Sequence, residues 1–158
     1  MECAVATIDE EEAHRHFAAV CFNRTWELLD QPDRTEAETA EMINTAHASR
    51  YHWSMRPDVE PLNLAISDWQ LSRVYAVAGD AETASGYAAA SLHLCEQYEL
   101  PAFNRGYAHE GLARAALVAG DAESRDRHLA AALEAAEAIE DEDHRSLLLA
   151  DLEDLTTE

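Results

Sequence analysis

The sequence contains no lysine, and its basic residues are 11 arginines set against 32 aspartates and glutamates. The formal net charge at pH 7 is therefore −21. A surface with this charge repels the phosphates of nucleic acids and the headgroups of anionic lipids, and no arginine-rich arm offsets the repulsion locally. The composition thus argues against nucleic acid and membrane surfaces as partners.

Cysteine is scarce as well. The three cysteines, Cys3, Cys21 and Cys95, lack the CxxC spacing of zinc sites and redox motifs, so we expect free thiols in a reducing compartment. The first residues show no basic segment followed by an apolar one. The longest stretch without a charged residue, 83–95, is too short to span a bilayer. We therefore expect a cytoplasmic protein.

Glycine and proline, which interrupt helices, number only five and four. No stretch alternates apolar and polar residues for long enough to predict a strand. Alanine, leucine and glutamate dominate the segments between the few glycines and prolines, and these residues favour helices. The sequence therefore predicts an all-α fold, and its 158 residues suffice for a single domain, 1–158, with one core.

One short motif, Gly-Asp-Ala-Glu, occurs twice, at 79–82 and at 120–123. Shifting the chain by the 41 residues between the two copies superimposes further identical pairs, among them Asn63 on Asn104, Leu71 on Leu112, Arg73 on Arg114 and Leu92 on Leu133. These matches indicate an internal repeat. Because glycine can end one helix and aspartate can begin the next, we interpret the motif as a turn between helices and not as an acidic metal site.

Each repeat is predicted to form a helical hairpin. Asn63 and Asn104 are expected to cap the first helices of the two repeats, and Leu133 is expected to face inward from a second helix. Residues 7–10 and 35–38 resemble capping boxes and predict a diverged first hairpin. The predicted boundaries of the hairpins are about 8–54, 62–99 and 102–139, followed by a capping helix over about 144–155.

The pattern Leu71-x-x-x-Tyr75-x-x-x-Gly79, followed by small residues in the next helix, resembles the tetratricopeptide repeat (TPR). The second repeat echoes it, and the period exceeds the common one of about 34 residues, so the resemblance is to the longer form. The stretches 47–53 and 72–77 are also similar to small uncharacterised bacterial TPR-like proteins. The resemblance implies a right-handed solenoid of three antiparallel hairpins plus a C-terminal cap, whose first helices form a concave groove.

Arg73 and Arg114 occupy equivalent positions, six residues before each turn glycine. In a solenoid both lie on first helices that face the groove, and such helices pack about 8–10 Å apart, so the two guanidinium groups can address one anion. Arginine suits this role because its planar fork matches a carboxylate or phosphate. The alternative is that each arginine pairs with a nearby acid, such as Asp68 or Glu110, and holds the repeats in register. The sequence leaves both interpretations open.

Three neighbours complete the candidate groove. Trp69 and Tyr107 are suitable aromatic anchors for a peptide, although either can equally be a core residue between stacked repeats. Glu110 lies one helical turn before Arg114 and is a further candidate groove residue. The groove therefore combines arginine, aromatic and acidic side chains.

A histidine-rich segment supplies the remaining candidates. His47 and Tyr51 share one face of a helix and are assigned to the hypothetical ligand-binding set. His47, His52 and His109 would form a histidine-based active site only if their imidazoles converged. We therefore predict no catalytic residue, no metal ligand and no cofactor.

These observations predict a non-catalytic module that binds a protein or peptide, with a carboxylate of the ligand as one candidate contact, in the groove of a TPR-like solenoid. A small-molecule effector sensor is the second hypothesis, expected if the groove encloses a compact pocket, and a histidine-based enzyme is the third. Three repeats are near the minimum for a stable solenoid, so a homo-oligomer is a further expectation.

Overall fold

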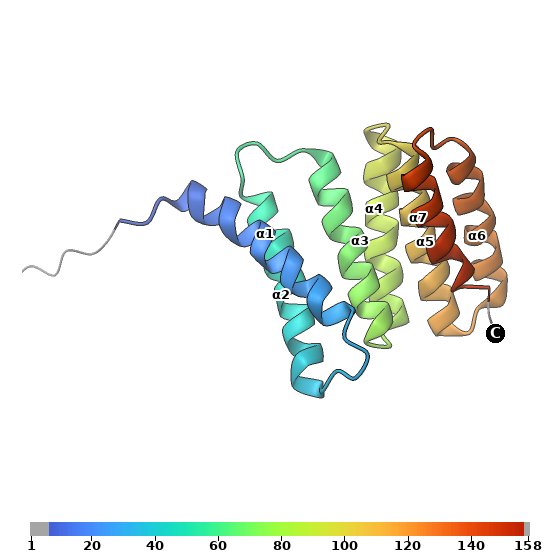
Figure 1. Cartoon of the computed structure of the whole chain (residues 1–158), viewed down its shortest axis with the longest axis horizontal. Coiled ribbons are helices and arrows are strands. Elements are labelled where there is room, and N and C mark those ends of the chain that lie inside the picture. Colours follow the sequence, from blue (N-terminus) through green and yellow to red (C-terminus); the bar gives the residue numbers. More distant parts are fainter. Residues whose placement is uncertain (1–6, 157–158) are drawn as a thin grey trace, which may run out of the picture.

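The computed structural model describes residues 7–156, which form seven α-helices and no strand (Figure 1). Cys3 lies outside the described residues, whereas Cys21 and Cys95 are free thiols. The predicted all-α class is confirmed. No helix of residues 7–156 is both long enough and apolar enough to cross a bilayer. In chain order the helices are α1 (Glu10–Leu29), α2 (Glu36–Ser54), α3 (Pro61–Val77), α4 (Ala81–Gln97), α5 (Ala102–Ala119), α6 (Ala122–Glu137) and α7 (Glu142–Glu153).

The two Gly-Asp-Ala-Glu motifs form turns between helices, as predicted. Gly79 has φ 87° and Gly120 has φ 73°, a left-handed conformation that glycine adopts without a steric penalty. The next residue then caps the following helix: Asp80 accepts a hydrogen bond from the Thr83 backbone N–H, and Asp121 does the same in the second copy. The motif is thus explained by helix termination and capping.

Several helices begin earlier or later than predicted. Asn63 does not cap α3, because Pro61, whose fixed φ suits the first helical position, starts the helix and Glu60 is its N-cap. The Asn63 Oδ1 instead accepts a hydrogen bond from the Glu60 backbone N–H at 2.9 Å. Asn104 is likewise internal, since α5 begins just after Pro101. At the other N-terminal signals, the capping box at 35–38 is confirmed, whereas α1 is capped by Asp9 and not by Thr7.

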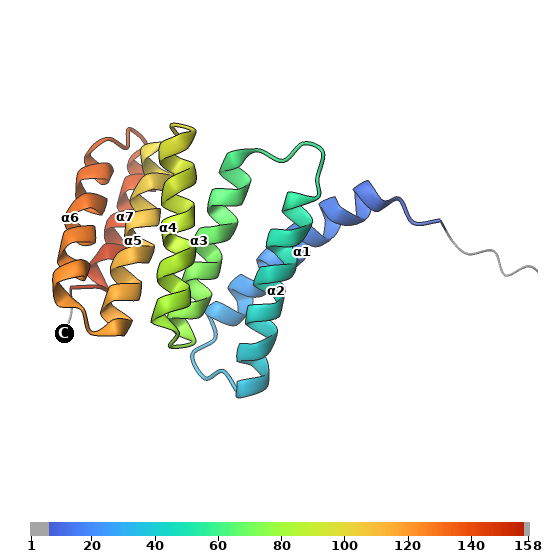
Figure 2. The same cartoon turned by 180° about the vertical axis from the view of Figure 1, so that it is seen from behind.

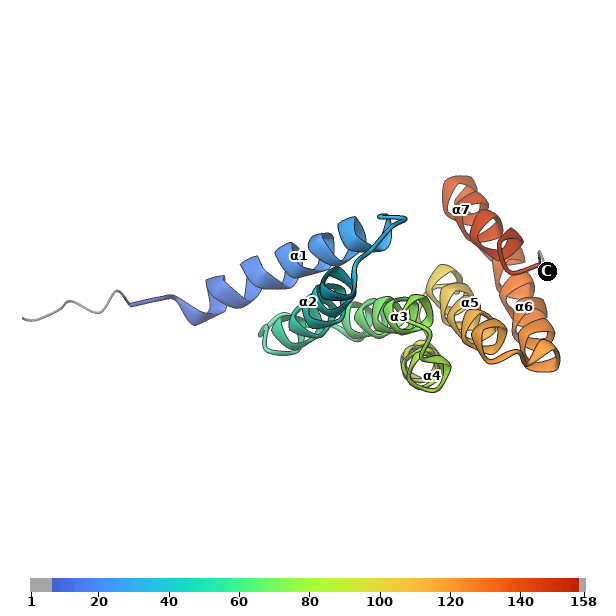
Figure 3. The same cartoon turned by 90° about the horizontal axis from the view of Figure 1, so that it is seen from below.

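Consecutive helices pack side by side along the chain (Figures 1 and 2). α1 contacts α2, α3 contacts α4 and α5 contacts α6, while α3 also touches α5 and α7 covers parts of α5 and α6. Viewed along the helices, α1 and α7 lie on one side of α3 and α5, and α4 lies on the other (Figure 3). We call the surface formed by α1, α3, α5 and α7 the odd-helix face.

Small residues allow α3, α4 and α5 to approach closely. A Cβ placed on Gly111 of α5 would lie 3.1 Å from Ala88 Cβ and 3.2 Å from Ser72 Oγ. The absence of a side chain on Gly111 therefore allows α5 to pack closely against α3 and α4. Larger side chains fill the two ends instead. Near the N-terminal end, Leu28 and Met42 belong to a buried cluster that also includes residues of α3.

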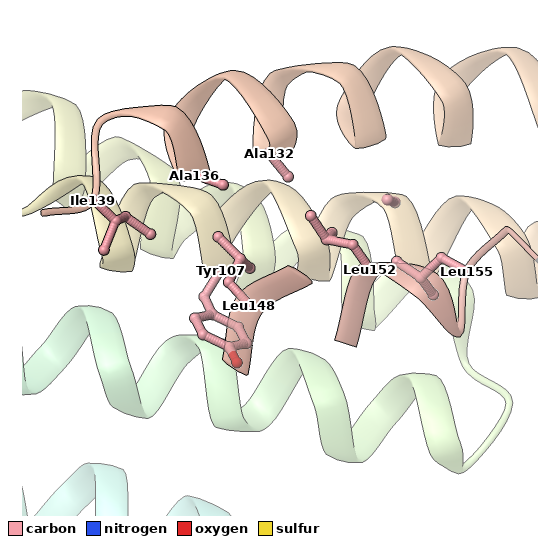
Figure 4. Packing of buried hydrophobic residues seen from close by; sticks show 8 residues of the cluster. Tyr107, Ala132, Ala136, Ile139, Leu148, Leu152 and Leu155 are labelled. Atoms are coloured by element: carbon pink, nitrogen blue, oxygen red, sulfur yellow. The ribbon is translucent and has the colours of Figure 1, made fainter. Parts of the chain in front are cut away.

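A cluster of buried residues near the C-terminal end shows how α7 packs against α5 and α6 (Figure 4). Leu148, Leu152 and Leu155 are buried against Ala132 and other residues of α5 and α6. Leu133, which was expected to face inward, is 43% exposed, so that prediction is wrong. Leu133 instead lines a surface cavity between α6 and α7, together with Arg145 and Leu149 of α7.

Candidate ligand-binding site

The centre of the candidate site is the carboxylate of Glu110, which is fully buried on α5. Its Oε1 accepts hydrogen bonds from Arg73 Nη1 of α3 at 2.8 Å and from Arg114 Nε of α5 at 2.7 Å. Its Oε2 accepts one from Trp69 Nε1 of α3 at 3.2 Å. Three donors from two helices therefore share one carboxylate, which joins α3 to α5.

The two arginines meet because the repeat places them at equivalent positions on neighbouring helices. Arg114 reaches Glu110 along its own helix, four residues away, whereas Arg73 reaches it across the interface between α3 and α5. Of the two acids considered as partners, Glu110 is the one used, and Asp68 pairs with Arg50 at 2.7 Å. The Arg73 and Arg114 side chains are 19% and 16% exposed, although the Nη2 atom of Arg114 is buried.

The charges at this point do not balance. Arg73, Glu110 and Arg114, which we call the arginine cluster, carry two positive charges and one negative charge. Arg114 Nη2 lies 2.6 Å from Glu110 Oε1 but is poorly aligned for a hydrogen bond, and it is buried with no better partner among the described residues. The cluster therefore keeps donor capacity and one excess positive charge, in a chain whose net charge is −21.

Aromatic rings extend from the cluster across the odd-helix face. Trp69 of α3 lies between Trp26 of α1, at 5.5 Å between ring centroids, and Tyr107 of α5, at 4.8 Å. Phe103 continues the row at 5.0 Å from Tyr107 and reaches His144 of α7 at 4.5 Å. Trp69 is only half-buried, so it is both a packing residue between helices and part of the surface.

Tyr107 is buried, and its hydroxyl donates to Asp151 Oδ2 of α7 at 2.7 Å. Burial and the neighbouring Asp151 carboxylate raise the pKa of Tyr107 well above its usual range, so the hydroxyl remains a donor. Asp151 is engaged by this hydroxyl and forms no ion pair with Arg73 or Arg114 among the described contacts. Tyr107 therefore links α5 to α7 and offers only its ring edge to the surface.

An apolar cavity of about 130 Å³ lies beside the arginine cluster, between α3 and α5. Trp69 and Tyr107 form two of its walls, and Ile66 and Phe103 contribute to the others. Its volume is close to the roughly 150 Å³ of an engineered apolar cavity that binds benzene, so it can hold one aliphatic or aromatic side chain. The site thus pairs an anion-binding group with a pocket for an apolar group.

The histidine-rich segment of α2 lies apart from this arrangement. His47 Nε2 is 2.8 Å from the Tyr75 hydroxyl, and burial lowers the pKa of His47. Tyr51 is 55% exposed and packs edge-on against the rings of His14 and His52. The structure therefore gives neither His47 nor Tyr51 a contact with the arginine cluster.

The imidazoles that an active site would require have separate partners. His52 Nδ1 lies 2.8 Å from His14 Nδ1, joining α1 to α2, and His109 Nδ1 lies 3.3 Å from His128 Nδ1, joining α5 to α6. Burial lowers the pKa of both His52 and His109, and the partner imidazole adds to the effect. Each pair therefore joins two helices through a contact between imidazole nitrogens, and no spacing in the sequence indicates either pair.

Comparisons with known proteins add no name to this site. No family model matches the chain, and neither a curated protein nor a solved structure matches it. Within residues 7–156, no group of three or more histidine, cysteine, aspartate or glutamate side chains is placed to hold a metal ion. The function therefore has to be argued from the chemistry of the odd-helix face.

Proposed function

We propose that the chain is a peptide- or protein-binding module, a single TPR-like domain in which three hairpins and α7 form a right-handed solenoid. Its ligand lies across the odd-helix face and brings a carboxylate to Arg73 and Arg114 and an apolar side chain to the adjacent cavity. Glu110 does not touch the ligand but positions the two arginines. The protein acts by binding and not by catalysis.

One observation carries this proposal: two arginines from equivalent repeat positions converge on one buried carboxylate and remain partly exposed. The cluster has two arginines for one acid. The second arginine leaves an excess charge, and guanidinium groups are well suited to a further bidentate carboxylate. Such charge-assisted hydrogen bonds contribute about 1.5–3 kcal/mol each, enough to anchor a peptide.

The alternative of a small-molecule sensor finds less support. The cavity beside the arginines, at about 130 Å³, is below the roughly 300–1,000 Å³ of sites that enclose a small ligand. A larger cavity of about 530 Å³ opens between the turn ends of α4, α5 and α6. Four of its polar side chains already have partners: Asp121 caps α6, Arg127 donates to Ser124, and His128 pairs with His109.

The test compares three variants of the full chain with the wild type. Each protein is used to select peptides from a random displayed library, and the affinities of the selected peptides, made synthetically, are then measured by calorimetric titration. The triple variant Arg73→Met, Glu110→Gln, Arg114→Met removes the cluster without leaving a buried charge unpaired, so we expect it to fold and to lose binding. The matched control, Arg125→Met with Arg127→Met, removes two arginines from α6 and should bind like the wild type.

The third variant is Glu110→Gln. Glu110→Gln keeps both arginines and the acceptor for Trp69 but removes the competing carboxylate, so acidic peptides should bind more tightly than to the wild type. Equal binding by the triple variant and the wild type would refute the site. If the wild type selects no peptide at all, the proposed function is wrong.

A further inference from the structure

A second apolar cavity lies on the other side of α3 from the first. It has a volume of about 190 Å³ and is lined by Phe22 of α1, Trp53 of α2, and Asn63 and Ile66 of α3. Ile66 also lines the cavity between α3 and α5, so this one side chain separates the two spaces. The two cavities are therefore neighbours on the odd-helix face.

The repeat relates the two cavities to each other. Shifting by 41 residues carries Asn63 onto Asn104 and Ile66 onto Tyr107, and these four residues line the second and the first cavity respectively. In both, an asparagine near the start of a first helix is followed three residues later by a large apolar side chain. One asparagine and one large residue are thus placed equivalently in the two cavities, one repeat apart.

The asparagines are suited to a polypeptide backbone. A carboxamide offers a donor and an acceptor, as a peptide group does, and can bond to both groups of an extended chain. The Asn104 side chain has no hydrogen-bond partner among the described residues, while Asn63 uses only its Oδ1, for the Glu60 backbone N–H. Each apolar pocket therefore has unused amide donors at its edge.

The distance between equivalent points sets the spacing of the ligand's side chains. Neighbouring packed helices are about 8–10 Å apart. A polyproline II segment advances about 3.1 Å per residue and has three residues per turn, so side chains three positions apart point the same way about 9 Å apart. In a β-strand, side chains on the same face recur after about 6.6 Å, which is too short. The pockets therefore match a spacing of three residues.

We propose that the odd-helix face binds an extended peptide whose two apolar side chains, three residues apart, enter the two cavities, with an acidic residue beside the apolar residue that enters the cavity between α3 and α5. The asparagines bond to its backbone, and the carboxylate reaches the arginine cluster. The rest of the partner is neutral or basic, because the net charge of −21 repels a generally acidic chain. This inference rests on the proposed function and specifies its ligand.

The experiment uses the peptides selected by the full-length wild-type protein. We expect enrichment of aliphatic or aromatic pairs separated by two residues. In a synthetic peptide of a selected sequence, moving one of the two apolar residues by one position along the peptide should weaken binding at least about tenfold. This is the loss expected when one large apolar side chain is left unburied. This change leaves the protein untouched, so its folding cannot affect the result.

Two protein variants complete the test. Ile66→Glu places a charge between the two cavities and should also weaken binding at least about tenfold. Val77→Glu, on the exposed end of the same helix, is the matched control and should bind normally. Circular dichroism and thermal unfolding establish that both variants fold.

The outcomes separate the two proposals. Peptides that bind through the arginine cluster but tolerate any apolar spacing and Ile66→Glu would overturn the inference and leave the proposed function standing. Selection of no peptide would overturn the proposed function and the inference with it. Dependence on both the spacing and Ile66 would support both.

Discussion

Replacing Glu110 by alanine removes the carboxylate that Arg73, Arg114 and Trp69 share. The two guanidinium groups, each less than one-fifth exposed, would then face one another without a counter-charge. Removing one member of a buried ion pair costs about 3–5 kcal/mol, because the remaining charge stays buried and unpaired. Since a domain of this kind is stable by about 5–15 kcal/mol in total, the loss is a large fraction of its stability.

Urea unfolding followed by circular dichroism and by tryptophan fluorescence measures this loss, and Trp69, which donates to Glu110, is one of the three tryptophans that contribute to the fluorescence. The same change corresponds to a fall in Tm of about 6–20 °C for a chain of this size. The control is Glu134→Ala, because Glu134 is an exposed acid in the last turn of α6 and its removal should change stability by no more than about 0.5 kcal/mol. If the two variants unfold at the same urea concentration, Glu110 does not join α3 to α5.

Three further substitutions test the packing around this site. Burial lowers the pKa of His109, so the unfolded chain binds a proton at this histidine more readily than the folded chain does. The contribution of His109 to the free energy of unfolding is therefore full above about pH 6.5 and falls as the pH drops below it. His109→Gln should reduce this dependence of stability on pH in urea titrations between pH 5 and 7.5. Tyr107→Phe loses the bond to Asp151 and should cost about 1–2 kcal/mol, with faster hydrogen exchange in α7; unchanged exchange there would contradict the link. Gly79→Ala, at φ 87°, should destabilise by about 1 kcal/mol, whereas Gly86→Ala, in an open helical position, should stabilise by about 0.5–1 kcal/mol; equal shifts in denaturation midpoint would contradict the assigned turn.

Turn chemistry is the part of the fold that the sequence predicts best. Gly79 and Gly120 need a left-handed conformation and the following aspartates need a free backbone N–H, and both requirements are local. Helix starts are less certain when two local signals compete, as where Pro61 begins α3 two residues before Asn63. Leu133 was misplaced because its environment depends on which side of α6 a later helix covers, and no local pattern contains that information.

The contacts within the candidate site are also only partly predictable from the sequence. The repeat predicts that Arg73 and Arg114 are neighbours, but the choice between Asp68 and Glu110 as their acid depends on how far α3 is rotated against α5. A periodicity in the sequence does not specify this rotation. The contact between His109 and its partner in α6 depends on packing in the same way.

Glu110 occupies a position at which the two repeats carry different residues. The 41-residue shift carries Arg73 onto Arg114 but carries Trp69 onto Glu110. A second tryptophan there would leave two guanidinium groups side by side with no acid between them, and like charges at partly buried positions repel strongly. Glutamate at this point neutralises one arginine, accepts the indole N–H of Trp69 and leaves the other arginine's charge available. The departure from the repeat therefore both stabilises the stack of α3 on α5 and limits the face to one further anionic group, which is why we expect a ligand with a single acidic residue at this point.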